Sequence, residues 1–160
     1  MSYPGRPSAV VAASLLIAVV GWRQSRNPRT AAFSAMMPIV VGITADLILK
    51  PLIDRRLGAT EALTFPSGHT TGITSVGVVA WLTCVSSWQH RARRLGGALL
   101  LVAVVATVGA SRVLLYAHYA TDVVGGVLYG AAATLAAAAV LLPRPVAQPG
   151  PEASVPGEGD

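Results

Sequence analysis

Five long apolar runs dominate this 160-residue chain and limit what it can fold into. A helix needs about 20 mostly apolar residues to cross the hydrocarbon core of a bilayer. Apolar residues make up 53% of the chain and charged residues only 12%, against about 25% in soluble domains. The sequence therefore predicts an all-α, polytopic membrane helical bundle with about five transmembrane helices. The runs are Ser8 to Trp22, Thr30 to Leu49, Gly68 to Trp88, Leu95 to Tyr116 and Asp122 to Leu142.

The first run is short enough to allow a second interpretation. Arg6 precedes it, as a basic residue precedes the apolar region of a secretory signal peptide. No small-residue cleavage site follows, because Val20 is succeeded by Gly21, Trp22 and Arg23. We therefore favour an uncleaved helix that is tilted or partly interfacial.

The composition changes abruptly after Leu142, where proline, glycine and acidic residues replace the apolar ones. A stretch of this kind has too few apolar side chains to form a packed core. We expect residues 1–142 to form one membrane-embedded domain. We expect residues 143–160 to form a disordered tail.

Arginines are distributed unevenly between the connections of such a bundle. They form short clusters between apolar runs, not the continuous basic surface that nucleic acid requires, so we expect no nucleic-acid partner. With five crossings, one side of the membrane holds seven arginines: Arg23, Arg26, Arg29, Arg91, Arg93, Arg94 and Arg144. The other side holds Arg6 and four cations of a polar cluster described next. The positive-inside rule then places the seven arginines and the tail in the cytoplasm, and the polar cluster on the extracytoplasmic face of the plasma membrane.

Ionisable residues gather at the ends of three apolar runs. Such groups are costly in or near a bilayer, so each is a candidate for function. The predicted topology brings them to the same membrane surface, and we therefore expect them to form one site. They are Asp46, Lys50, Asp54, Arg55 and Arg56 after the second run, His69 at the start of the third, and Arg112, His118 and Asp122 between the fourth and fifth.

The cations of this cluster favour a phosphate ligand. Guanidinium groups match the oxygens of a phosphoryl group. Four positive charges near lipid are costly without an anion beside them, and a phosphoryl group supplies one. Ser67 and Gly68 follow Pro66 at the expected start of a helix, where backbone N–H groups and the helix dipole also attract anions. The candidate phosphate ligands are therefore Lys50, Arg55, Arg56, Ser67, Gly68 and Arg112.

Two histidines and a carboxylate are the candidate catalytic residues. His118 and Asp122 are four residues apart, a spacing that places them one above the other on a helix. The carboxylate can hold one imidazole nitrogen and leave the other free as a nucleophile. His69, from another helix, can protonate a leaving group.

Some of these residues have a simpler structural interpretation. Asp46 precedes Lys50 by four residues, and we expect it to neutralise that lysine in a partly buried pair. A metal site formed by the two histidines and Asp122 is disfavoured, because zinc sites use three or four well-placed ligands and four cations lie nearby. The spacing of Gly126 and Gly130 predicts close packing of helix backbones.

These motifs resemble those of a known family. Pro66-Ser67-Gly68-His69 looks like the second motif of the type 2 phosphatidic acid phosphatase superfamily, which also contains bacterial acid phosphatases and vanadium haloperoxidases. Ser111-Arg112 with His118 and Asp122 looks like its third motif, and fits at every spaced position. The resemblance covers Lys50 to about Gly130. By this resemblance the chain is identified as a small integral-membrane member of bacterial type.

The resemblance implies a helical-bundle core, no metal ion or other cofactor, and a covalent phosphohistidine on His118. It implies that His69 is the general acid and that Asp122 orients His118. It assigns phosphate binding to Lys50, an arginine of the first motif, Ser67, Gly68 and Arg112.

The first motif departs from the family pattern. Family members usually have lysine, six intervening residues, then arginine and proline, but here the last two positions are Leu57 and Gly58. Either Arg55 or Arg56 then completes the pocket, and we favour Arg55, five residues after Lys50. Integral-membrane members typically have six spans, so with five one amino-terminal helix is expected to be missing.

We therefore expect a membrane lipid phosphatase that hydrolyses a phosphomonoester or diphosphate of a polyprenyl or glycerolipid substrate. A first alternative is a non-catalytic phospholipid-binding membrane protein that retains the phosphate pocket. A second is a vanadate-dependent haloperoxidase, disfavoured because those relatives are soluble and larger. A transporter is disfavoured because the charged residues lie at one surface and not at the membrane midplane.

Overall fold

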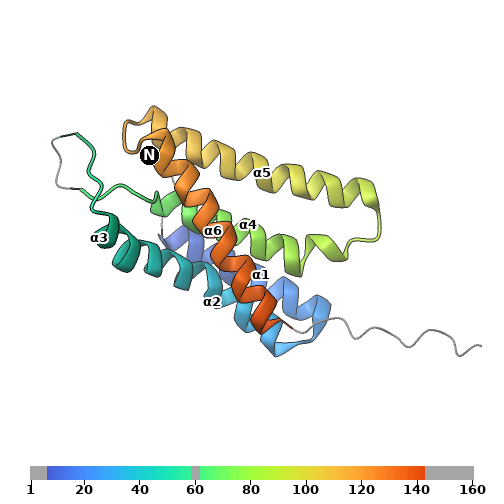
Figure 1. Cartoon of the computed structure of the whole chain (residues 1–160). Coiled ribbons are helices and arrows are strands. Elements are labelled where there is room, and N and C mark those ends of the chain that lie inside the picture. Colours follow the sequence, from blue (N-terminus) through green and yellow to red (C-terminus); the bar gives the residue numbers. More distant parts are fainter. Residues whose placement is uncertain (1–6, 59–61, 143–160) are drawn as a thin grey trace, which may run out of the picture.

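The computed structural model describes residues 7–58 and 62–142, and this part of the chain is helical without any named strand (Figure 1). The prediction of an all-α bundle is therefore confirmed, while the predicted tail, residues 143–160, lies outside the described residues. The elements are α1 (Pro7–Ser25), α2 (Pro28–Thr44), the π-helical segment η1 (Ala45–Leu49), α3 (Lys50–Ile53), α4 (Gly68–Thr83), the 3-10 turn η2 (Val85–Ser87), α5 (Arg91–Leu114) and α6 (Ala120–Leu141).

Five helices within the described ranges are long and apolar enough to cross a membrane. This confirms the expected number of spans. The segments α2, η1 and α3 join into one span of 26 residues, Pro28–Ile53. The first helix is longer than expected: α1 continues past Trp22 to Ser25 and reaches 19 residues. Asn27 separates it from α2, because its side chain accepts a hydrogen bond from the Arg29 N–H at 2.9 Å and caps the new helix.

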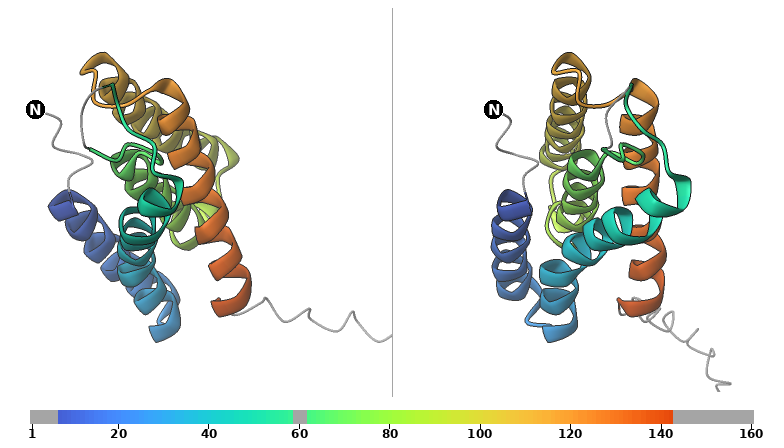
Figure 2. Two further views of the ribbon diagram at one scale, coloured as in Figure 1. Left: turned by 60° about the vertical axis from the view of Figure 1, so that its left-hand side comes forward. Right: turned by 90° about the vertical axis from the view of Figure 1, so that its left-hand side faces the viewer.

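Helix α4 lies at the centre of the bundle, enclosed by α1, α2, α5 and α6 (Figure 2). Its span is 67% buried, whereas none of the other four exceeds 28%. The helix is rich in small and hydroxyl-bearing residues, and these lie inside while apolar side chains of the outer helices face outward. This arrangement suits a lipid environment, where helices associate through close packing and hydrogen bonds, not through burial of apolar surface.

Two glycines let α6 approach α4 closely. A Cβ atom on Gly126 would lie 2.8 Å from the Ser67 carbonyl oxygen, and one on Gly130 would lie 2.6 Å from that of Thr71. Further along the same contact, the hydroxyls of Ser75 and Thr134 are 2.7 Å apart. The packing role predicted for the two glycines is confirmed.

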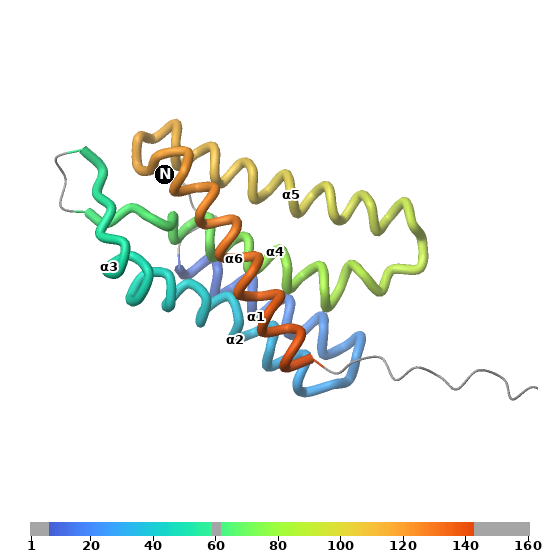
Figure 3. The backbone as a smooth tube through the Cα atoms, in the orientation of Figure 1, coloured from blue at the N-terminus to red at the C-terminus, as the bar shows by residue number. Residues whose placement is uncertain are grey.

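The two ends of the bundle differ in chemistry. The α1–α2 and α4–α5 connections lie at one end, together with the last residues of α6 (Figures 1 and 3). The arginine clusters that begin with Arg23 and Arg91 lie there. At the opposite end, α3, the start of α4 and the α5–α6 connection meet (Figure 3). All the candidate site residues belong to this second end.

We expect Gly130→Ala to destabilise the protein, because its new methyl group would collide with backbone of α4 that cannot move independently. Overpacking of this kind costs about 1–3 kcal/mol. The measurement is the midpoint of thermal unfolding in detergent. Gly96→Ala is the matched control, since a Cβ there meets no atom within 4 Å, and better helix propensity should stabilise that variant by about 0.5–1 kcal/mol. Equal midpoints for the two variants would contradict the close α4–α6 contact.

Candidate active site

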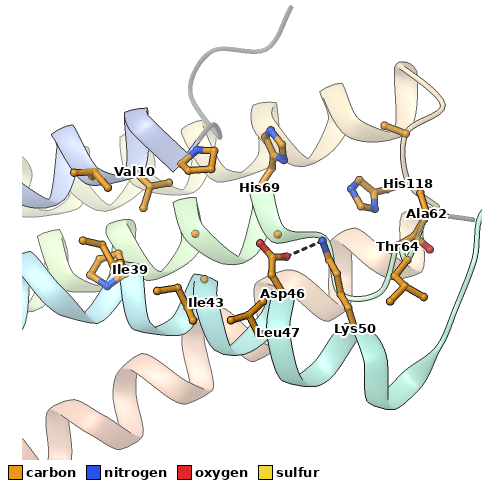
Figure 4. A pocket seen from close by; sticks show the side chains of 18 residues that line it. Val10, Ile39, Ile43, Asp46, Leu47, Lys50, Ala62, Thr64, His69 and His118 are labelled. Atoms are coloured by element: carbon orange, nitrogen blue, oxygen red, sulfur yellow. Dashed lines mark ion pairs between the residues drawn. The ribbon is translucent and has the colours of Figure 1, made fainter.

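A cavity of about 530 Å³ lies at the end of the bundle where α4 begins. One part of its wall is polar and is formed by Asp46, Lys50, His69 and His118 (Figure 4). The remaining wall is mostly apolar and comes largely from α1 and α2. That apolar part includes Pro7, Val10, Val11, Pro38, Ile39 and Ile43. The cavity therefore joins a charged end to an apolar groove between helices.

The start of α4 is fixed by contacts to α6. Ser67 is the residue that precedes the helix, and it is fully buried. Its N–H donates to the Asp122 carbonyl at 2.9 Å, and its hydroxyl accepts a hydrogen bond from Thr70 at 3.1 Å. The first N–H groups of α4 have no partner within the helix, as at every helix start. Because these groups follow Ser67, the rigid α4–α6 contact determines where they point.

Asp46 and Lys50 form the ion pair that their spacing predicts. The Lys50 Nζ atom lies 2.7 Å from Asp46 Oδ1, and Figure 4 shows both side chains in the cavity near His69. The carboxylate also lies against the start of α4, because a Cβ on Gly68 would be 2.8 Å from the same oxygen. The Asp46 carboxylate thus already lies beside two groups that attract anions, the Lys50 ammonium and the N-terminus of α4. Asp46 belongs to η1, and π-helical turns often occur at functional sites.

His118 and Asp122 lie together, but they do not share a helix. The expectation that one helix carries both is wrong, because α6 begins at Ala120. The Asp122 side chain accepts a hydrogen bond from the Tyr119 N–H at 2.9 Å, which caps the helix after His118. The loop still returns His118 toward the carboxylate, so that Nδ1 lies 3.7 Å from Oδ2. This separation is longer than a hydrogen bond, and among the described residues Nδ1 has no hydrogen-bond partner.

Arg112 positions the loop that carries His118. Its carbonyl oxygen accepts hydrogen bonds from the N–H groups of Ala117 at 3.0 Å and His118 at 3.3 Å. Its side chain is buried, and in the described part of the protein its Nε atom has no hydrogen-bond partner. A buried guanidinium with free donor capacity is suited to an incoming anion.

Arg55 and Arg56 do not line the cavity. Arg55 directs its guanidinium to Asp122, with Nη1 3.3 Å from Oδ1. Arg56 directs its own to the exposed carboxylate of Asp54, at 3.1 Å. The structure therefore gives both arginines carboxylate partners where the sequence predicts phosphate ligands. Spacing alone did not reveal this, because the direction of these side chains depends on the loop that follows α3.

The structure brings the other candidates to one place. Lys50, Gly68, His69 and His118 line the cavity. Ser67, Arg112 and Asp122 are buried and touch these residues or their neighbours through the contacts given above. Sequence reasoning missed Tyr119, whose ring lies 5.0 Å from the Arg55 guanidinium carbon. The available signal was an aromatic residue directly after His118.

The surroundings of His118 lower the pKa of its imidazole below the ordinary value of 6.5. Burial is the largest cause, since it disfavours the charged form. The Asp122 carboxylate opposes this effect and raises the pKa, while Lys50 and Arg112 lower it further. The imidazole is therefore neutral at neutral pH, which leaves one nitrogen lone pair available.

The sequence model of the PAP2 superfamily matches residues 51–144, more than half of the chain. The chain belongs to the PAP2 superfamily. Every candidate residue except Asp46 and Lys50 falls within the matched range. Searches of curated proteins and of solved structures give no match. Membership of the PAP2 superfamily indicates phosphatase-type activity on phosphate esters, and the five apolar helices indicate a multi-pass membrane protein.

We expect the His118 imidazole to titrate with a midpoint below pH 6.5 in the folded protein. The measurement is an NMR titration of the detergent-solubilised protein with isotope-labelled histidine, which is tractable because the chain has three histidines. The signal that disappears in His118→Gln identifies the residue. A midpoint at or above 6.5 would show that Asp122 outweighs burial and the cations.

Proposed function

We propose that this PAP2 superfamily member is a membrane lipid phosphatase that hydrolyses a phosphomonoester or diphosphate of a lipid through a phosphohistidine on His118. The observation that carries the proposal is the joined cavity. Its polar wall presents His69, His118 and Lys50, and its apolar wall continues between α1 and α2. A soluble phosphate ester has no use for the apolar wall, whereas a lipid tail does.

In the proposed reaction His118 carries its proton on Nδ1, the nitrogen that faces Asp122, and attacks phosphorus with Nε2. The N–P bond forms as the P–O bond to the lipid breaks, and His69 gives a proton to the departing oxygen. Water then attacks the phosphohistidine, His69 accepts its proton, and inorganic phosphate leaves. Asp122 stabilises the positive charge that the imidazole gains in the first step.

Stabilisation of the phosphoryl oxygens falls to Lys50, Arg112 and the N–H groups at the start of α4. Phosphoryl transfer depends mainly on positioning and on charge stabilisation. These groups supply both without a metal ion or other cofactor. Asp46 has to share Lys50 with the substrate, because its carboxylate already lies on that ammonium group.

For the substrate we favour a polyprenyl phosphate or diphosphate over phosphatidate, as the resemblance suggests for so small a chain. The tail remains in the membrane and the head group reaches the cations from the side. The excess of arginine at the opposite end supports a site on the extracytoplasmic face of the plasma membrane. Leu57 and Gly58 stand where family members usually have arginine and proline. This departure supports one alternative function, a binding protein that keeps the pocket without turnover.

The decisive experiment is phosphate release by the purified protein in detergent with EDTA, using a polyprenyl diphosphate and phosphatidate. We expect His118→Gln to lose activity by about 10⁴-fold or more, and His69→Gln by about 10²–10⁴-fold. Arg93→Gln, at the far end of α5, should retain the wild-type rate. Wild-type protein that is folded but releases no phosphate from either lipid would support the rival binding protein.

We expect Gly42→Leu to impair lipid turnover selectively. Gly42 lines the cavity, and a Cβ there meets no atom within 4 Å, so the added side chain starts in open space and occupies part of the groove. The KM for a long-chain lipid phosphate should rise at least about tenfold, which corresponds to about 1.4 kcal/mol. Hydrolysis of p-nitrophenyl phosphate should not change. Gly96→Leu is the control, since its Cβ also meets open space but lies on α5. An equal loss for both substrates would contradict tail binding in this groove.

A further inference from the structure

Asp122 is a charged group with no exposure, and one cation contacts it among the described residues. Its side chain is 0% exposed, and the Arg55 Nη1 atom lies 3.3 Å from Oδ1. The other oxygen, Oδ2, accepts the Tyr119 N–H at 2.9 Å and faces His118 at 3.7 Å. A buried carboxylate needs such partners, because removal from water is costly unless the charge is compensated.

Both the backbone and the side chain of Arg55 have partners that fix its position. The Arg55 backbone carbonyl oxygen accepts hydrogen bonds from the Thr64 N–H at 2.8 Å and from the Thr64 hydroxyl at 3.2 Å. Its guanidinium carbon lies 5.0 Å from the centre of the Tyr119 ring and 6.0 Å from that of Phe65. Both aromatic rings attract a cation at these distances. These contacts therefore hold the Arg55 guanidinium beside Asp122 without any substrate.

We propose that Arg55 is a positioning residue: its guanidinium holds the Asp122 carboxylate in place beside His118 and offsets part of its charge, and it does not bind the substrate phosphate. The inference rests on the proposed function, in which His118 is the nucleophile. It gives the arginine of the altered first motif a different task from the one that the sequence resemblance assigns.

The physical reason is the balance of charge around His118. Asp122 favours a second proton on the imidazole, and the resulting imidazolium has no lone pair with which to attack phosphorus. Arg55 offsets part of that carboxylate charge, so that Asp122 orients the ring with less bias toward the imidazolium. The other charged or titratable groups around His118 act in the same balance: Lys50 of α3, Arg112 of α5, His69 of α4 and, on the Lys50 ammonium, Asp46 of η1.

The test compares Arg55→Gln, which removes the cation, with Arg55→Lys, which keeps it. In an NMR titration of labelled histidine, Arg55→Gln should raise the His118 midpoint by about one pH unit, and Arg55→Lys should leave it near the wild-type value. Arg93→Gln is the arginine control and should not move it. An unmoved His118 midpoint in folded Arg55→Gln would overturn the inference. If Arg55→Gln does not fold, a wild-type midpoint in Arg55→Lys together with a raised midpoint in Arg55→Met carries the same comparison.

Kinetics give a second, independent readout. Arg55→Gln should lower kcat by about 10–100-fold with little change in KM, and it should cause no further loss in an Asp122→Asn background, because the two residues act as one unit. A raised KM with additive losses would instead make Arg55 a phosphate ligand and overturn the inference. Failure of the wild type to release phosphate would refute the proposed function, while the histidine titration would still decide whether Arg55 acts on His118 through Asp122.

Discussion

Compensation of the buried charge on Asp122 organises the functional end of this protein. The backbone carbonyl of Asp122 accepts the Ser67 N–H, and its side chain accepts the Tyr119 N–H. The same carboxylate pairs with Arg55 and faces His118. One residue thus connects α6, the start of α4, the loop after α3 and the loop before α6. Loss of the negative charge would deprive Arg55 and the Tyr119 N–H of their charged partner, whereas the Ser67 N–H would keep its bond to the backbone carbonyl.

The rest of the bundle meets the opposite requirement, which is to place apolar groups against lipid. Its centre is therefore small and polar: α4 packs on α6 through Gly126 and Gly130, and Ser75 bonds to Thr134. Close backbone contact makes the α4–α6 pair the rigid part of the structure. This packing fixes the positions of the charged residues at its end, as phosphoryl transfer requires.

The length and apolar character of the spans were sufficient to predict the fold, because an apolar segment of about 20 residues satisfies its own backbone inside a bilayer when it is helical. The spacing of His118 and Asp122 predicted their proximity, yet the reason was different from the expected one. Asp122 caps α6, so His118 lies in a loop and not on the helix. The partner of Arg55 could not be predicted, because no periodic pattern describes the loop between α3 and α4. Side-chain direction there follows from hydrogen bonds such as those from Thr64 to the Arg55 carbonyl.

Most of the apolar wall of the cavity comes from α1 and α2, whereas its two histidines come from later in the chain. Val10, Ile39 and most other apolar residues that line it precede Lys50, while Leu63 and Ala117 join them from later in the chain, as do His69 and His118. Substitutions in α1 and α2 can therefore reshape the apolar wall while the reactive groups keep their places on the α4–α6 frame. Such a division lets descendants of one ancestor diverge in the molecules they accept and still inherit the same reaction unchanged.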